Sequence, residues 1–198
     1  FSFHFYKNKY CIFCFPFIFL LTGLKEIGWE RIASIKVSFS LYFIGLIVPN
    51  IISTIGFSGN YKGAWVYKIA PFNGTKAIFK GTIKASFVSL ILPLYIFIGI
   101  IFMVIFKGKI FMDLIILFLT LLLFIIICFN LATKRLPFST PFEEGNKGEG
   151  IIAIFFILIL GVLAGAHYIA TMFKYGMLVY MIALVIFNIF AWRKGFSY

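Results

Sequence analysis

The sequence predicts an all-α fold, a polytopic membrane bundle of about six transmembrane helices with both termini in the cytoplasm. Apolar residues make up 63% of the 198 residues and charged residues only 12%. A soluble domain carries about 45–50% apolar and about 25% charged residues. Long apolar runs recur along the chain, and lysines gather between them. A soluble fold of this size could not bury so much apolar surface, so the main solvent of this chain is lipid.

Six apolar runs are the expected spans of one transmembrane domain, residues 1–198. They cover residues 10–24, 37–57, 87–106, 110–131, 151–172 and 175–192. A helix needs about 20 residues to cross the hydrocarbon core. Helices are required because lipid offers the backbone no hydrogen-bond partner. The chain begins at Phe1 rather than Met, which leaves open that it is a fragment of a longer protein.

The first three runs contain prolines. The run 10–24 is short and is interrupted by Pro16, so we expect a tilted, kinked or incomplete helix. Pro49 lies in the second run and Pro93 in the third. We expect a kink at each of these two prolines, since neighbouring groups can satisfy the carbonyls that a proline leaves free.

The last three runs differ in their interruptions. The run 110–131 has none, which excludes the weakly alternating strands of a barrel. The run 151–172 contains Gly161 and Gly165 in a GxxxG pattern, where small residues let helix backbones approach closely. A contact inside the bundle and a dimer face are both open interpretations of this pattern.

The basic residues set the orientation. Lys62, Lys68, Lys76, Lys80 and Lys84 lie in the stretch 58–86, which holds no acidic residue. An excess of Lys and Arg marks cytoplasmic loops, so loops 58–86 and 132–150 are predicted to be cytoplasmic. The net charge of +12 could also indicate nucleic-acid binding. We exclude that function because topology already explains where the lysines lie.

Loop 58–86 is the candidate functional site. Trp65 and Tyr67 have amphipathic rings that suit the headgroup level of a membrane. After the break at Pro71, residues 75–86 are predicted to form a short helix with its lysines on one stripe. This helix either faces a protein partner or is held on anionic lipid, at about 1 kcal/mol per lysine.

One segment of this loop resembles a known family. It reads Tyr61-Lys-Gly-Ala-Trp-Val-Tyr-Lys-Ile-Ala-Pro-Phe and is followed by Lys80-Gly-Thr-Ile-Lys-Ala. With the six-helix topology, it resembles the cytoplasmic loop of bacterial ABC transporter permeases of the type-2 exporter class. In that family a short coupling helix between the second and third transmembrane helices docks on the ATPase.

The resemblance implies a permease subunit of an ATP-driven exporter in the bacterial cell (inner or plasma) membrane. The implied partners are membrane lipid, a separate P-loop ATPase subunit that binds ATP and Mg, and another permease half in a homo- or heterodimer. The implied ATPase-coupling residues are Tyr61, Trp65, Tyr67, Lys68, Pro71, Lys76, Lys80 and Lys84. Glu143 and Glu144 in loop 132–150 are then expected to form a second cytoplasmic contact, although a solvated connector is the alternative.

Few residues in the chain could carry catalysis or hold a metal. The sequence has no H-E-x-x-H motif and no Gly-rich phosphate loop, so we expect neither an enzyme nor a cofactor in this chain. Cys11 and Cys14 form a C-x-x-C pattern without a second cysteine pair, and we interpret them as apolar helix residues. We expect His167 to be a neutral histidine bonded to a neighbouring helix, with proton relay as the alternative, and Asp113 to pair with Lys107 or Lys109.

Two other classes of function remain open. One is a non-transporting integral membrane binding, immunity or assembly protein, which the scarcity of polar groups at membrane depth favours. The other is a substrate-capture component of a vitamin transporter, which suits the length but lacks an obvious polar pocket. The sequence indicates neither the substrate nor the direction of transport.

Overall fold

The computed structural model describes residues 41–69, 75–132, 135–141 and 149–195. The prediction of an all-α fold is confirmed for these residues, which add to their helices only an isolated bridge between Phe57 and Thr140. The elements in chain order are η1 (Phe43–Leu46), α3 (Ile47–Ile55), η2 (Tyr61–Trp65), α4 (Val66–Ile69), α5 (Lys76–Ser86), η3 (Phe87–Ile91), α6 (Leu92–Ile105), α7 (Phe111–Leu131), α8 (Glu149–Thr171) and α9 (Gly176–Lys194).

Four helices of the described residues are long and apolar enough to cross a membrane, which supports a multi-pass membrane protein. They are Lys76–Ile105, Phe111–Leu131, Ile154–Thr171 and Gly176–Lys194. The structure therefore supports four spans and not the predicted six. The predicted span 10–24 lies outside the described residues. The predicted span 37–57 is described only from Leu41 onward, where it forms the shorter apolar helix Phe43–Ile55.

The third predicted span differs from expectation at its start. The short helix predicted at 75–86 and the span predicted at 87–106 form one continuous helix, because no glycine or proline separates α5 from η3. The η3 segment is a π-helix turn that comes directly before Pro93. A proline ring clashes with the turn before it, and a wider turn relieves that clash.

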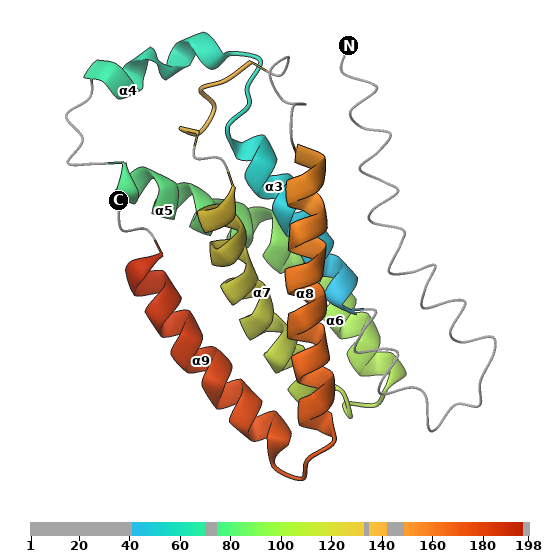
Figure 1. The fold of residues 1–198 in the computed structure, drawn as a ribbon. Coiled ribbons are helices and arrows are strands. Elements are labelled where there is room, and N and C mark those ends of the chain that lie inside the picture. Colours follow the sequence, from blue (N-terminus) through green and yellow to red (C-terminus); the bar gives the residue numbers. More distant parts are fainter. Residues whose placement is uncertain (1–40, 70–74, 133–134, 142–148, 196–198) are drawn as a thin grey trace.

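Helix α7 forms the centre of the bundle (Figure 1). It packs against α3, α6, α8 and α9, and 56% of its apolar stretch is buried, against 11% for α9. Its fully buried side chains include Leu121, Phe124 and Ile125. The outward side chains of α9 are apolar as well, which is expected of a helix that faces lipid. The sequence alone does not show which of these two helices is central, since both are apolar runs.

The helices of the bundle meet turns and short elements at two opposite ends (Figure 1). We call one the basic end: it holds η2, α4, the start of α5, the 135–141 segment and the end of α9. The opposite end holds the turns 106–110 and 172–175. In the first of these turns Gly108 has φ of +79°, a conformation that favours glycine. Helix α5 runs across the basic end before α6 descends through the bundle.

Candidate functional site

The outer surface of the basic end carries exposed aromatic and aliphatic side chains beside lysines. Trp65 is 60% exposed and Ile69 is 67% exposed, and Tyr61 and Lys62 are also exposed. Tyr67 is half-buried. Large apolar side chains at such a position contact either lipid headgroups or another protein. Lys68 belongs to α4, nothing is described of its side chain, and Pro71 lies outside the described residues.

The lysines of α5 are not displayed equally. Lys76 and Lys84 are exposed, whereas Lys80 is half-buried. The Lys84 ammonium lies 5.7 Å from the centre of the Trp192 ring at the end of α9, a cation–π distance. The predicted lysine stripe is therefore present on α5, but one of its members contacts a neighbouring helix.

Helix α5 is anchored to α7 by its apolar face. The Phe79 and Phe129 rings have centroids 5.3 Å apart and are tilted by 50°, and Ile83 is 1% exposed. Such tilted aromatic pairs contribute about 0.5–1.5 kcal/mol beyond the burial of their area. Helix α5 therefore packs against the central helix of the bundle.

The segments that follow α3 and α7 are joined by backbone hydrogen bonds. Ser58 N donates to Thr140 O and Thr140 N donates to Gly56 O, each over 2.9 Å. The Thr140 hydroxyl also donates to Gly56 O over 2.8 Å, and Phe138 N donates to Ile55 O over 2.9 Å. These bonds satisfy the last carbonyls of α3. Glu143 and Glu144, the predicted second contact, lie outside the described residues.

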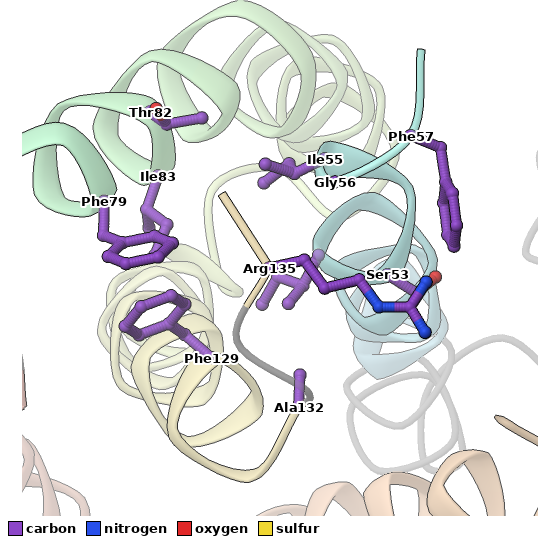
Figure 2. Close-up of a pocket in the computed structure, with 11 residues that line it drawn as sticks. Ser53, Ile55, Gly56, Phe57, Phe79, Thr82, Ile83, Phe129, Ala132 and Arg135 are labelled. Atoms are coloured by element: carbon purple, nitrogen blue, oxygen red, sulfur yellow. The ribbon is translucent and has the colours of Figure 1, made fainter. Parts of the chain in front are cut away.

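A hollow opens at the basic end between α3, α5, α7 and Arg135 (Figure 2). The space within it that water-sized molecules could occupy is about 30 Å³. Figure 2 shows the Arg135 side chain crossing toward α3, with Phe79 and Phe129 on the other side of the hollow. The Arg135 guanidinium lies 5.2 Å from the centre of the Phe57 ring. Its Nη1 atom is buried, and no described residue forms a hydrogen bond with it.

The predicted kink and packing residues are placed as follows. Pro49 lies in the first turn of α3, directly after the 3-10 turn η1, and Pro93 opens α6 after the π turn η3. A Cβ built at Gly161 or Gly165 meets no described atom within 4 Å. The packing partner predicted for these two glycines is therefore not among the described residues. The close approach lies at Gly45 instead, where a Cβ would lie 2.8 Å from Leu160 Cδ1.

A buried polar cluster, which the sequence did not reveal, lies toward the opposite end. The Tyr42 hydroxyl lies 3.1 Å from His167 Nδ1, and His167 Nε2 lies 3.2 Å from Asp113 Oδ1. The second contact is close enough for an electrostatic attraction, but its alignment is not that of a hydrogen bond. The Tyr180 ring stacks on His167 with centroids 6.0 Å apart. The partner of Asp113 is thus His167 rather than Lys107 or Lys109.

The cluster ties four elements together. Tyr42 precedes η1, Asp113 lies in the first turn of α7, His167 in α8 and Tyr180 in α9, where its hydroxyl donates to Leu163 O over 3.0 Å. His167 is 3% exposed and Asp113 13% exposed. The expectation that His167 bonds to a neighbouring helix agrees with this geometry. The sequence does not indicate that Tyr42 belongs to a polar cluster, because it is one of several aromatic residues in an apolar run.

Asn188 in α9 is another buried polar residue within a span. It donates from Nδ2 to Leu119 O of α7 and to Leu184 O of its own helix, each over 2.9 Å. No described residue forms a hydrogen bond with its buried Oδ1. Among the described residues, no three His, Cys, Asp or Glu side chains lie close enough together to hold a metal ion. Cys128 is a free, buried thiol, and Cys11 and Cys14 lie outside the described part of the chain.

These features define a multi-pass helical membrane protein with a basic, partly aromatic surface at one end of the bundle. Comparisons with protein-family models, with curated proteins and with solved structures found no match to this chain.

Proposed function

We propose that this protein is a membrane-spanning permease subunit of an ATP-driven ABC exporter and that its basic end receives a separate P-loop ATPase. The observation that carries the proposal is the backbone link between Phe57 and Thr140. The segments after α3 and α7 are held together by it, and α5 is anchored to α7 through Phe79 and Phe129. A movement of the ATPase bound at the basic end would therefore act on α3, α5 and α7 together.

The side chains at the basic end suit a protein partner. Protein interfaces centre on buried aromatic anchors and are surrounded by a charged rim. Trp65 and Ile69 are large apolar groups that a partner would cover, and Lys62, Lys76 and Lys84 are exposed charges at the same end of the bundle. The resemblance of the 61–84 segment to the coupling loop of type-2 exporters supports the same role. The competing role for these residues, retention on anionic lipid, has a different experimental signature.

A route from the docking face to the membrane follows from the continuous helix Lys76–Ile105. Its first part lies across the basic end and its second part crosses the bundle, with η3 and Pro93 between them. Irregular turns of this kind absorb changes in helix direction. Movement of α5 would then be converted into a tilt of α6, which is the type of motion that alternating access requires.

The proposed topology has six spans with both termini in the cytoplasm of a bacterial cell. Residues 10–24 and 37–57 would supply the first two spans, and loops 58–86 and 132–150 would be cytoplasmic. The excess of Lys and Arg in those loops supports this orientation. A second permease half, identical or similar, would complete the transporter, and ATP with Mg would be bound by the ATPase.

Copurification tests the proposal. The double variant Lys76→Glu and Lys84→Glu reverses two exposed charges, and we expect it to lose most of the associated ATPase. The control Lys107→Glu and Lys109→Glu makes the same change at the opposite end and should retain the ATPase. Wild-type protein purified in mild detergent without any P-loop ATPase, or equal ATPase retention by both double variants, would contradict the docking role. A lysine surface that binds only lipid would show equal retention.

Accessibility labelling tests the orientation independently. A single cysteine at Lys62 should be labelled by an impermeant thiol reagent only after cells are opened. A single cysteine at Lys174 should be labelled in intact cells. The reverse pattern would invert the topology and exclude docking of a cytoplasmic ATPase at the basic end.

A second function, a non-transporting membrane binding or assembly protein, is favoured by one observation. The buried polar side chains of the described residues, Thr120, His167 and Asn188, contact groups of this same chain. None of them lines the hollow at Arg135. This function predicts a copurifying membrane protein without a nucleotide-binding subunit, so the same purification separates the two proposals.

A further inference from the structure

The buried polar cluster at the opposite end of the bundle lacks one positive charge. The Asp113 carboxylate is 13% exposed, and the only described residue with which it forms an ion pair is His167, which is 3% exposed. A neutral imidazole leaves this carboxylate without a compensating charge, and taking an unpaired charge out of water is costly. One proton on the imidazole would give an imidazolium–carboxylate pair with no net charge.

The contact between these two side chains is loose at His167 Nε2. This atom is buried, and no described residue forms a hydrogen bond with it, although Asp113 Oδ1 lies 3.2 Å away. Hydrogen bonds between charged partners are shorter, about 2.7–2.9 Å from nitrogen to oxygen, and roughly twice as strong as neutral ones. A positive charge on the ring therefore tightens a contact that the neutral ring makes poorly.

The other side of the ring can adapt to the same proton. When Nε2 carries the proton of the neutral ring, the Tyr42 hydroxyl donates to His167 Nδ1 over 3.1 Å. An imidazolium donates from both nitrogens, so Nδ1 then donates to the Tyr42 oxygen. The Tyr42 hydroxyl turns its own proton to Thr120, with which it is in contact. Thr120 can accept this proton because its own hydroxyl donates to Ile116 O over 2.8 Å.

The cluster lies close to the opposite end of the bundle, from which protons can reach it. Helix α8 ends at Thr171, so His167 lies about 6 Å from that end, and Asp113 lies in the first turn of α7. Local opening at a helix end is enough to bring the ring into contact with water. A proton also needs no cavity, unlike a molecule or a metal ion.

The other titratable groups around His167 leave this proton to the ring. Among the described elements, η1, α7 and α9 pack against α8. They bring Tyr42, Asp113 and Tyr180 to the ring, and Tyr168 follows it on α8 itself. Tyrosine ionises only near about pH 10, so these hydroxyls stay neutral in the range where histidine titrates. The lysines at this end form no described ion pair with Asp113. They are Lys107, Lys109 and Lys174, all of them exposed.

We propose that His167 and Asp113 form a proton-binding site that equilibrates with the aqueous phase at the opposite end of the bundle. The proton forms a new N–H bond at His167 Nδ1, and the Asp113 carboxylate compensates the charge of the imidazolium. Tyr42 precedes η1, and the two charged groups lie in α7 and α8, so the bound proton holds these three elements together more firmly. This inference goes beyond the exporter proposal and does not require an ATPase.

Nitrogen-15 NMR of histidine tests the site with the full chain in phosphatidylcholine nanodiscs. The chain has two histidines, so His4→Gln leaves His167 as the only labelled ring. At about pH 8 we expect a neutral ring with one protonated nitrogen, and at about pH 5.5 an imidazolium with both nitrogens protonated. A ring that stays neutral across this range would overturn the proposal.

Two substitutions of Asp113 separate its charge from its place in the fold. Asp113→Asn removes the compensating charge and should lose most of the imidazolium signal at the lower pH, whereas Asp113→Glu keeps the charge and should retain the signal. The matched control Glu149→Gln removes a carboxylate at the other end of α8, about 27 Å from His167, and should titrate as the parent does. Equal losses in Asp113→Asn and Glu149→Gln, or no loss in either, would refute the pairing.

A further variant covers the case in which Asp113→Asn does not fold. Thr120→Val removes the acceptor for the Tyr42 proton, so it should leave the neutral ring unchanged at the higher pH and weaken the imidazolium signal at the lower pH. An unchanged titration in this variant would contradict the proposed rearrangement. Failure of these titrations would leave the exporter proposal standing, and failure of ATPase copurification would leave the proton site standing, because the NMR samples contain no ATPase.

Discussion

Replacing Tyr42 by phenylalanine removes one hydroxyl from the buried polar cluster, with its contacts to His167 and Thr120. The carboxylate of Asp113 lies beside His167 Nε2 and favours the tautomer that is protonated at Nε2. His167 Nδ1 then accepts a hydrogen bond from the Tyr42 hydroxyl. The substitution removes only the hydroxyl and leaves a buried acceptor without a donor. Tyr42 is 5% exposed and His167 is 3% exposed, so water does not replace the lost bond.

The expected cost is about 1 kcal/mol. A neutral hydrogen bond contributes about 0.5–1.5 kcal/mol, and bonds between membrane helices average about 0.6 with a maximum near 1.7 kcal/mol. The free energy of unfolding can be measured by circular dichroism in mixed micelles of a mild detergent and sodium dodecyl sulfate. A double-mutant cycle with His167→Leu should give a coupling energy of about 0.5–1.5 kcal/mol. Either substitution alone already removes the bond, so the doubly substituted protein does not lose it a second time.

Tyr175→Phe is the matched control, because the same hydroxyl is removed from a side chain that is 65% exposed. We expect it to change stability by less than about 0.3 kcal/mol. A Tyr42→Phe cost no larger than that of the control, together with a coupling energy near zero, would refute the reasoning and mean that the cluster does not join these helices.

Three further substitutions use the same unfolding assay. Gly45→Val should cost about 1–3 kcal/mol, because its side chain must displace Leu160. Gly161→Ala meets no described atom and should gain up to about 1 kcal/mol from helix propensity. The opposite order of the two effects would contradict the packing at these two glycines. Asn188→Leu should be nearly neutral, since it removes the unpaired Oδ1 along with the bond to Leu119. Asn188→Asp should cost about 2.5–3.5 kcal/mol, because it places a charge within the span. Similar costs for the two variants would argue against a position inside the membrane. Phe79→Ala should cost about 1–3 kcal/mol through loss of its contact with Phe129, and an unchanged stability would show that α5 is not anchored to α7.

Local composition accounts for the prediction of an all-α fold, which is confirmed for the described residues. The run 110–131 is helical as Phe111–Leu131 because its apolar residues leave lipid as the solvent and lipid permits only hydrogen-bonded helices. Loop 58–86 was recognised from lysines that lie close together in sequence, and the lysine stripe of α5 depends only on helical spacing. The GxxxG pattern shows the limit of this kind of reading, because small residues permit a close approach without specifying a partner.

The amino-acid sequence by itself therefore determined that this is a helical membrane protein with lysines clustered between two of its apolar runs. The tertiary structure decided the rest: that α7 is central, that Asp113 meets His167 and Tyr42, that Phe57 is joined to Thr140, and that a hollow forms at Arg135. The physical reason is that burial in lipid acts on each segment separately, whereas these contacts join residues from different helices. Their geometry exists only after the helices have packed.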